Sequence, residues 1–552
     1  MGRWTKWLGI TMLVGVFGCT NDSPPTTPDG RTAAVATPAD ARPNILLIVA
    51  DDLGYTDLGA FGSEIPTPNL DELAFAGIRL TNLHTGRACQ QTRAMLMSSR
   101  GAASVIEERP NRPGGPRDNS LTLNVAVLPE LMQDAGYSTY MSGKWDLGMS
   151  GDYRPAVRGF DRSFAMLASA GSHFADYFWG EEAYYEEHGI PVALENLPED
   201  FYSTRVYTDK MLEFLQAHDG DNPWFAYMAY TAPHWPLQLP EDWLDRHAGN
   251  YDAGYDVLRT ERAARAGELG VIPAGATLEA YQPLAIPWSE LNTEEQAKFS
   301  RAQEIYAGMV EYLDLSIGRV IAYLEDSGQL DTTVIMFMSD HGASAGQYGV
   351  YTGRGPDLGR LPVEPNTPDN RFENFGRFRS FIDHGIGFGE AATAPLKYFK
   401  GRLAEGGIRA AAIIRYPSVI SEPSIDGTFI TTMDILPTFL DIAGAEHPGE
   451  GPYRGRDIMP ILGKSFWPYL LGEKSAVRDS SDSAGWSTGA TGAVIRGNYK
   501  AINEGPAGMG MSAAVPWRLY DLSVDPGEIN DISADHPELT AELAAEWETD
   551  WR

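Results

Sequence analysis

The uninterrupted apolar segment Asn44-Ile-Leu-Leu-Ile-Val-Ala50 constrains the fold more than any other part of this 552-residue chain. Polar and apolar residues do not alternate in it, so the strand that it predicts is buried on both faces, as in a parallel sheet covered by helices. Strands that alternate with helices predict an α/β fold with a large, mostly parallel sheet. Further strands are predicted at 138–142, 224–230, 333–338 and 408–415, with helices at 70–76, 128–135 and 208–218 and a long, broken helical stretch at 294–327.

The pattern changes near residue 466. Residues 492–502 and 517–522 have the composition of hairpin strands, and a segment rich in Ala, Glu and Leu at 537–551 predicts a helix. We therefore expect a main domain over residues 43–465 and a smaller C-terminal α+β subdomain over residues 466–552.

The first 42 residues have the features of a leader and a tether. Residues 1–19 combine basic residues, an apolar stretch and small residues, which predicts a signal peptide. Its end, Val16-Phe-Gly-Cys19, resembles a bacterial lipobox, and simple cleavage without a lipid remains the alternative. Residues 20–42 are rich in Thr, Pro, Ala and Asp and predict a flexible linker. We expect an exported protein that is periplasmic or anchored to the outer membrane as a lipoprotein.

The net charge and the cysteine content limit the classes of partner and of chemistry that fit the chain. The formal net charge of −32 argues against nucleic acid and anionic membrane surfaces as partners, which leaves a lipid anchor as the expected membrane contact. The chain has 2 cysteines, and Cys19 belongs to the predicted leader. Cys89 is then a lone thiol near the basic residue Arg93, as expected of a nucleophile or its precursor.

Polar residues directly follow several of the predicted strands. In an open α/β sheet, ligands bind at the carboxyl ends of the strands, so we expect these residues to share one edge. Carboxylates suit Ca²⁺ or Mg²⁺, and nearby cationic groups would bind a tetrahedral sulfate or phosphate ester. The candidate metal ligands are Asp51, Asp52, Asp340 and His341, and the candidate positive groups are Arg93, Lys144, His234 and Lys400.

The order of these motifs resembles the type I sulfatases, and bacterial arylsulfatases in particular, across nearly all of residues 43–552. Each motif is weak alone, whereas their number and order are specific. The motifs are Pro43-Asn-Ile-Leu-Leu-Ile-Val-Ala-Asp-Asp-Leu-Gly-Tyr55, Cys89-x-x-Thr-Arg93, Gly143-Lys-Trp145, Thr231-Ala-Pro-His-Trp-Pro236, Ser339-Asp-His-Gly342, Lys400-x-x-x-x-Glu-Gly-Gly-Ile-Arg409 and Leu519-Tyr-Asp-Leu522.

The resemblance implies an alkaline-phosphatase/sulfatase-like fold and a role for each matching residue. A maturation enzyme would oxidise Cys89 to formylglycine, whose hydrate attacks the sulfur of a small-molecule or saccharide sulfate ester. Arg93 would hold this hydrate and the metal site. In the same comparison, Asp51, Asp52, Asp340 and His341 match calcium ligands, Lys144 and Lys400 would bind the sulfate oxygens, and His234 and Lys400 would protonate the leaving oxygen.

The chain departs from the family pattern at two places. Gln91 replaces a proline of the cysteine motif, which ends in Ser98-Ser99-Arg100 and not in Thr-Gly-Arg. Asp146 replaces a histidine that hydrogen-bonds the nucleophile in the family. Besides an active sulfatase, two alternatives therefore stay open: a phosphate or phosphonate ester hydrolase of the same superfamily, and a calcium-binding pseudoenzyme.

Overall fold

The computed structural model describes residues 42–107, 119–174, 177–178, 181–182, 185–276, 283–345, 369–420, 422–506 and 512–552. Residues 42–552 form one compact unit. The predicted signal peptide, its Cys19 and all of the predicted linker except Arg42 lie outside the described residues. Within the described ranges, no helix is long and apolar enough to cross a membrane.

The main sheet confirms the prediction of mostly parallel strands. Its five central strands run parallel in the order β6-β5-β11-β1-β12. The four strands predicted at 44–50, 138–142, 224–230 and 333–338 are therefore direct neighbours, and their carboxyl ends lie at the same edge. These strands are β6 (Arg162–Met166), β5 (Ser138–Lys144), β11 (Trp224–Pro233), β1 (Asn44–Asp51) and β12 (Thr333–Ser339).

One strand in the middle of the sheet runs the other way. β13 (Arg409–Arg415) is antiparallel both to β12 and to β2 (Ile78–His84), so β2 again runs parallel to β12. The residues that precede β13 and those that follow β2 consequently meet at the edge where β1 ends. The sheet is extended by β14 (Ser424–Asp426) and β15 (Ile430–Thr431) on one side and by β9 (Tyr185–Glu187) and β10 (Ile190–Val192) on the other.

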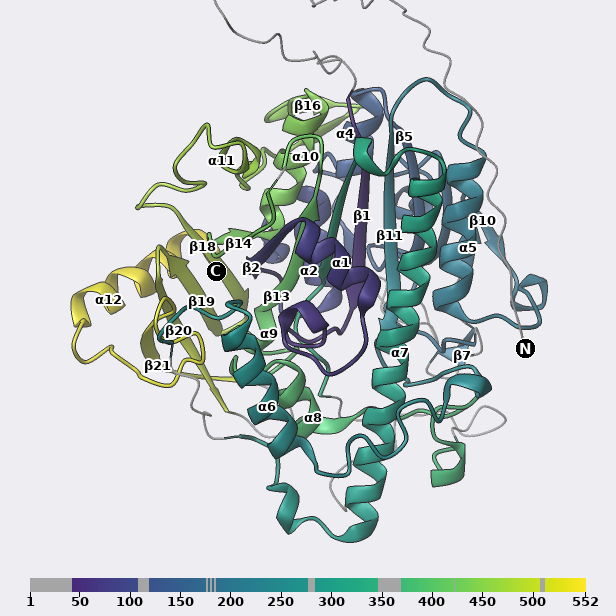
Figure 1. Cartoon of the computed structure of the whole chain (residues 1–552). Helices are drawn as coiled ribbons and strands as arrows, with labels where there is room; N and C mark the ends of the chain where they lie inside the picture. The colour runs from purple at the N-terminus through teal and green to yellow at the C-terminus, as the bar shows by residue number, and fades with distance from the viewer. Residues whose placement is uncertain are drawn as a thin grey trace, which may run out of the picture. The chain divides into compact units, whose positions relative to one another are not determined.

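Strand β1 contributes residues to the hydrophobic cores on both faces of the sheet. Leu46 and Ile48 belong to the core on one face of the sheet, and Ile45 and Leu47 belong to the core on the other face. This alternation explains why the segment is apolar throughout, because each face is covered by helices (Figure 1). The first core includes α1 (Pro68–Ala76), α5 (Ser203–Gln216) and α7 (Thr293–Asp326), and the second includes α2 (Cys89–Ser98), α4 (Leu128–Asp134) and α10 (Ile435–Ala443).

Helix α7 corrects the prediction of a broken stretch, because it runs unbroken for 34 residues. It begins with a capping box, in which the Asn292 side chain accepts hydrogen bonds from the backbone and the Glu295 carboxylate accepts one from the backbone N–H of Asn292. Its glycines allow close packing: a Cβ on Gly308 would lie 2.5 Å from Leu239, and one on Gly318 would lie 2.4 Å from Asn69. Both glycines thus serve close contacts along a continuous helix.

The C-terminal residues contain the predicted hairpin strands and helix. An antiparallel sheet is formed by β18 (Ser483–Thr488), β19 (Thr491–Arg496), β20 (Tyr499–Pro506) and β21 (Ser512–Asp521). The predicted helix at 537–551 divides into α12 (Pro537–Glu546) and a π-helical turn at Trp547–Trp551. Ala484, Trp486 and Ile495 of this sheet share a core with Met95 and Ile408. The boundary near residue 466 stays a prediction.

Candidate active site

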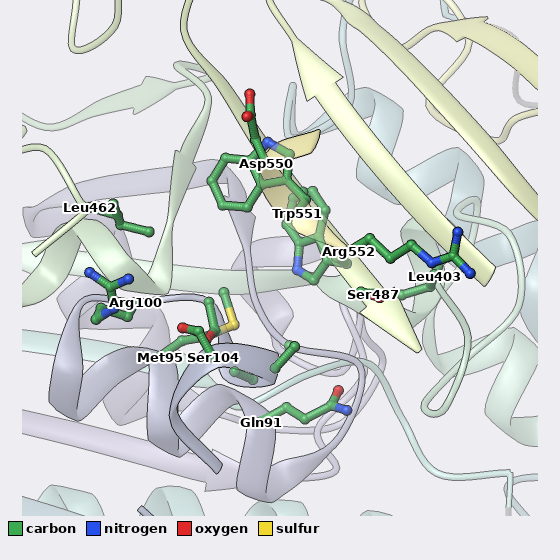
Figure 2. Close-up of a pocket in the computed structure, with 16 residues that line it drawn as sticks. Gln91, Met95, Arg100, Ser104, Leu403, Leu462, Ser487, Asp550, Trp551 and Arg552 are labelled. Carbon is green, nitrogen blue, oxygen red and sulfur yellow. The ribbon is translucent and has the colours of Figure 1, made fainter. Parts of the chain in front are cut away.

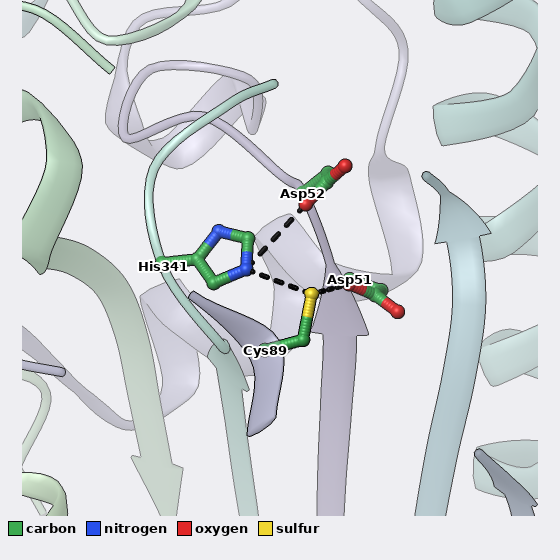
Figure 3. A group of neighbouring side chains, drawn as sticks. All are labelled: Asp51, Asp52, Cys89 and His341. Atoms are coloured by element: carbon green, nitrogen blue, oxygen red, sulfur yellow. Dashed lines mark hydrogen bonds and ion pairs between the residues drawn. The ribbon is translucent and has the colours of Figure 1, made fainter. Parts of the chain in front are cut away.

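Cys89 lies at the edge of the sheet where the carboxyl ends of the parallel strands meet. It is the first residue of α2, and its Sγ lies 3.3 Å from Oδ1 of Asp51 and 3.2 Å from Nε2 of His341 (Figure 3). Asp51 ends β1, and His341 follows β12, two residues after its end. The structure therefore brings the lone thiol of the predicted mature chain together with two of the predicted metal ligands.

Four side chains in this position form a cluster that could hold a metal ion. One ligand atom from each of Asp51, Asp52, Cys89 and His341 lies within 4.8 Å of the others, and all four residues are buried. Asp340, the remaining predicted ligand, lies beside this cluster, with Oδ1 3.3 Å from Nε2 of His341. Its Oδ1 also accepts a hydrogen bond of 3.2 Å from the backbone N–H of Asp52.

Two features of this cluster fit a hard cation. Oδ2 of Asp52 is buried and accepts no hydrogen bond from the described residues, which is costly for a carboxylate oxygen. The Nδ1 of His341 lies 2.9 Å from the carbonyl oxygen of Gly342, so Nδ1 carries the proton and Nε2 offers its lone pair toward the cluster. The three carboxylates suit Ca²⁺ or Mg²⁺, and the imidazole nitrogen is an additional donor that is more usual for transition metals.

Arg93 is fully buried and joins the carboxylates of two strands. Its Nη2 lies 3.3 Å from Oδ2 of Asp340 and 3.5 Å from Oδ2 of Asp51. The other end of the fork, Nη1, donates to the carbonyl oxygen of Lys144 and to the hydroxyl of Tyr227. Arg93 thus contacts two of the predicted metal ligands, and its role in holding the metal site stays a prediction.

Two lysines contribute positive charge from opposite sides. Lys144, at the end of β5, places Nζ 2.6 Å from Oδ2 of Asp51, and Lys400 places Nζ 2.6 Å from Oδ1 of Asp52. Lys144 is fully buried, whereas the side chain of Lys400 is 19% exposed, so Lys400 borders the solvent side of the site. Its backbone N–H donates to the carbonyl oxygen of Ala343, close to the end of β12.

His234 completes the set of predicted residues. Its Nε2 lies 3.5 Å from Oδ2 of Asp52, and its Nδ1 donates to the carbonyl oxygen of Trp235. His173, a residue that the sequence did not suggest, donates from Nε2 to the carbonyl oxygen of His234 over 2.9 Å. Ser203 in turn contacts Nδ1 of His173 at 2.7 Å, which fixes the ring that supports His234.

The carboxylates at the end of β1 lie among cationic side chains, which shift their pKa values. Burial would raise the pKa of Asp51, yet the charges of Lys144 and Arg93 hold it well below its usual value. Burial raises the pKa of Asp52 to about 7 despite Lys400, with Asp51 adding to the rise. A bound cation would favour the ionised form of Asp52.

The two histidines and the thiol are kept uncharged. Burial lowers the pKa of both His234 and His341 well below the usual range, and the charge of Lys400 adds to this in both cases. Burial, together with Asp51, raises the pKa of the Cys89 thiol well above its usual value. An unmodified thiol in this position is thus a poor nucleophile, since the thiolate is the reactive form.

The loop after β1 is held by groups that have no signal in the sequence. Asp52 adopts a left-handed backbone conformation with φ 67°. The hydroxyl of Tyr306, on α7, lies 3.1 Å from the carbonyl oxygen of Asp52 and 2.6 Å from Oδ2 of Asp57. Asp57 also accepts the backbone N–H of Gly54, which closes the loop. From sequence alone, a tyrosine in the middle of a long buried helix would be predicted to be a core residue.

The two departures from the family pattern have different surroundings. Gln91 lines a cavity of about 190 Å³ together with Met95, Arg100 and Trp551 (Figure 2). In the folded chain its side chain therefore belongs to the contact region between α2 and the C-terminal residues. Asp146, in contrast, is buried near the site: Oδ2 accepts a hydrogen bond from Ser169 over 3.1 Å and lies 4.0 Å from Nζ of Lys144.

Comparisons with known proteins identify the family of this chain. The sequence model of the Sulfatase family matches residues 43–445. An uncharacterized sulfatase of Schizosaccharomyces pombe is 41% identical over 92% of this chain and 93% of its own length. An arylsulfatase of Klebsiella aerogenes is 32% identical over 77% of this chain and 91% of its own length.

Solved structures confirm the fold. The crystal structure of Ps i-CgsB in complex with k-i-k-neocarrahexaose matches with a TM-score of 0.65 over 92% of each chain, at 22% identity. The large, mostly parallel sheet with helices on both faces and a small C-terminal antiparallel sheet is thus the alkaline-phosphatase/sulfatase fold. With the family model covering most of the chain and the lone described thiol set in a buried cluster of metal-binding side chains, the chain belongs to the sulfatase family and is a sulfuric ester hydrolase that cleaves sulfate esters.

Proposed function

We propose that this chain is an exported, calcium-dependent sulfatase whose Cys89 matures to formylglycine. The observation that carries the proposal is the position of Cys89, whose Sγ contacts Asp51 and His341 at the centre of the buried cluster. The unmodified thiol is held uncharged there and is a poor nucleophile. Conversion of Cys89 to another nucleophile would make this position reactive.

Asp51, Asp52, Asp340 and His341 would hold the calcium ion. Their donor set and the unsatisfied Oδ2 of Asp52 fit a hard divalent cation. Bound Ca²⁺ supplies Lewis-acid stabilisation of a sulfate oxygen, and the formylglycine hydrate supplies a hydroxyl nucleophile.

The cationic side chains of the chain itself would bind and orient the ester. Lys144 and Lys400, which approach Asp51 and Asp52 at 2.6 Å, would each place an ammonium beside the sulfate oxygens. Arg93 keeps the carboxylates fixed through Asp51 and Asp340, so the site needs little reorganisation when charge develops.

His234 and Lys400 would serve the leaving oxygen. The Nδ1 of His234 carries its proton toward the carbonyl oxygen of Trp235, so neutral His234 presents a bare Nε2 to the site. His234 must therefore take up a proton at Nε2 before it can donate one. Lys400 remains protonated, because its carboxylate partner Asp52 keeps the pKa of the ammonium well above its usual value in spite of burial, and it can donate directly.

Sulfate monoesters of small aryl alcohols or of saccharides are the proposed substrates. The arylsulfatase of Klebsiella aerogenes, 32% identical to this chain, supports aryl sulfates as the first compounds to test. The formylglycine-generating maturation enzyme is the proposed protein partner.

The proposal is tested by the mass of the Cys89 peptide and by sulfate release in the same preparation. The chain, produced with a maturation enzyme, is expected to carry an aldehyde at Cys89 and to release sulfate from an aryl sulfate. Cys89→Ala from the same host is the control. An intact thiol with no sulfate release would exclude this proposal and favour a calcium-binding pseudoenzyme. Release of phosphate from the matching aryl phosphate, with no release of sulfate from the aryl sulfate, would favour the phosphate ester alternative.

We also propose export and attachment through a lipid on Cys19. Support comes from the basic and apolar residues at 1–19 and from Val16-Phe-Gly-Cys19. The N-terminal peptide of the protein isolated from its native host is expected to carry a lipid mass. A soluble form that begins after Cys19 or at another small residue would contradict lipidation, and a chain that retains residues 1–18 in the cytoplasm would contradict export.

A further inference from the structure

A second buried cluster of charges lies between the active-site segments and the C-terminal sheet. It consists of His84, Glu405, Lys500 and Glu528, which are all buried, and we refer to it as the Glu405 cluster. Nζ of Lys500, on β20, lies 2.8 Å from Oε1 of Glu405 and 3.0 Å from Oε1 of Glu528. The backbone N–H of Glu405 donates to Oε2 of Glu528 over 2.9 Å. Glu405 is thus held by the C-terminal residues at both its backbone and its carboxylate.

Glu405 is also bound to the segment that carries Cys89. Nε2 of His84 lies 3.1 Å from Oε1 and 3.0 Å from Oε2 of Glu405. His84 is the last residue of β2 and precedes Cys89 by five positions, while Glu405 follows Lys400 by five positions. One carboxylate therefore joins the two segments that deliver Cys89 and Lys400 to the active site.

The same two segments contact each other directly. The backbone N–H of Gly401 donates to the carbonyl oxygen of Arg87, and the guanidinium of Arg87 donates back to the carbonyl oxygen of Gly401. Two further bonds from the C-terminal sheet reach them: Nε1 of Trp486 donates to the carbonyl oxygen of Thr85 over 2.7 Å, and Oε2 of Glu504 accepts the N–H of Leu403 over 2.8 Å.

We propose that Lys500 is a positioning residue of the active site, which acts through Glu405 to hold the Lys400 segment and the Cys89 segment in register. This inference rests on the proposed function. Lys500 itself contacts neither the metal cluster nor Lys400; it neutralises the carboxylate that both segments depend on. Without Lys500, Glu405 keeps His84 and Arg409, the latter at 3.7 Å, but Glu528 loses its ion pair with Lys500. The excess buried negative charge is then expected to shift the Glu405 carboxylate from its present position. The small C-terminal sheet thereby contributes to catalysis without supplying a group that touches the substrate.

The test compares Lys500→Met, which keeps an unbranched apolar side chain, with Arg496→Met as a matched control. Arg496 lies in the same sheet, on β19, and pairs with Glu542 and Glu546 of α12, away from the active-site segments. Lys500→Met is expected to lower kcat on an aryl sulfate by about tenfold or more with a smaller change in KM, because a displacement of about 1 Å can cost up to about a hundredfold. Arg496→Met is expected to keep the wild-type kcat.

A double mutant separates positioning from general destabilisation. If Lys500 acts through the Lys400 segment, Lys500→Met is expected to lower kcat by a much smaller factor in a Lys400→Met background than in the wild type. A full-sized loss of kcat in that background, or a wild-type kcat for Lys500→Met alone, would overturn the inference. If Lys500→Met does not fold, Lys500→Gln, which removes the charge but keeps an N–H donor near Glu405, undergoes the same comparison and decides it.

Hydrogen exchange gives a readout that does not require activity. Backbone amides at 85–92 and 397–409 are expected to exchange faster in Lys500→Met than in the wild type, and not in Arg496→Met. If the wild type releases no sulfate at all, the proposed function fails, and exchange alone then decides this inference. Equal protection of both segments in wild type and Lys500→Met would reject it.

Discussion

The ammonium of Lys144 lies 2.6 Å from Oδ2 of Asp51, and both side chains are buried. Asp51 is also a proposed calcium ligand, so this carboxylate is compensated by a lysine in the same place where a cation would bind. The pairing links the stability of the fold to the occupancy of the metal site.

We predict that Lys144→Met destabilises the chelated protein by about 3–5 kcal/mol, the usual cost of breaking a buried ion pair. With saturating Ca²⁺ the loss is expected to be smaller, because the cation compensates Asp51 in place of the lysine. Urea unfolding with and without Ca²⁺ measures both values. Lys210→Met, which removes partly exposed pairs with Glu187 and Glu213, serves as the control and should cost less than about 1 kcal/mol in either condition.

Removal of the metal is predicted to abolish turnover and to lower the melting temperature. A ligand present at about 100 times its Kd stabilises the folded state by about 2.7 kcal/mol, and chelation removes that contribution. Adding back Ca²⁺ should restore both the rate and the melting temperature. An unchanged rate and melting temperature after exhaustive chelation, with no metal found by elemental analysis, would reject the assignment of Asp51, Asp52, Asp340 and His341.

Cys89→Ala is predicted to remove turnover and to leave the fold intact. The thiol is small and uncharged in the folded chain, so its loss should change the free energy of unfolding little compared with its effect on the rate. Cys89→Ser is also expected to be inactive in hosts whose maturation system accepts only cysteine. Circular dichroism and the rate on an aryl sulfate measure the two effects, and a normal rate for purified Cys89→Ala would require another nucleophile.

We predict weak activity of the wild type on simple aryl sulfates and a higher rate for Asp146→His. A lost hydrogen bond to the reacting group costs roughly 2.7–4 kcal/mol in other enzymes. Asp146 lies 4.0 Å from Nζ of Lys144, whereas Asp51 lies at 2.6 Å, so Asp51 is the principal partner of that lysine. Rates on a panel of aryl sulfates, at equal aldehyde content, test this. Uniformly slower hydrolysis by Asp146→His would show that Asp146 holds Lys144 or the substrate.

Because His173 is buried, the free energy of unfolding is expected to fall in acid. Burial lowers the pKa of His173 to about 4, from 6.5 in the unfolded chain. Between these values the unfolded chain binds a proton that the folded chain does not, so the free energy of unfolding should fall by up to about 3 kcal/mol as the pH drops from 6.5 to 4. In His173→Gln, which can still donate to the carbonyl oxygen of His234, urea midpoints should fall less over this range. An equal fall in both proteins would contradict the prediction.

In open α/β sheets, ligands bind at the carboxyl ends of the strands, and this rule explains how much of the site could be predicted from sequence. Asp51, Lys144, His234 and Asp340 lie at or directly after the ends of apolar strands, and those four strands proved to be parallel neighbours. Their meeting therefore follows from the pattern of the chain and from the geometry of parallel sheets.

Lys400 could not be placed in this way, because it precedes a strand. It reaches the site because β13 is antiparallel to β12, so the beginning of β13 lies at the edge where β12 ends. The direction of a single strand is a property of tertiary pairing that an apolar segment such as 408–415 does not reveal. The position of Lys400 beside the candidate metal ligands therefore does not follow from the strand pattern.

Tyr306 and Lys500 lacked any signal in the sequence. Tyr306 lies in an amphipathic helix where an aromatic residue is ordinary, and Lys500 lies in a hairpin where a lysine would be expected to face solvent. The role of each residue can be recognised only when its partner in the fold is known. The partner of Tyr306 is Asp52, and that of Lys500 is Glu405. Long-range pairs of this kind are separated by 95 or more positions, and local patterns carry no information about them.

Helix α7 fixes two distant loops at once. Tyr306 bonds the carbonyl oxygen of Asp52, and eight positions later Asp314 accepts the backbone N–H groups of Asn69 and Leu70 at the start of α1. Each inserted residue would turn one of these contacts by about 100° around the helix axis relative to the other and shift it by about 1.5 Å. The spacing between Tyr306 and Asp314 therefore cannot change in length without releasing either the loop after β1 or the start of α1.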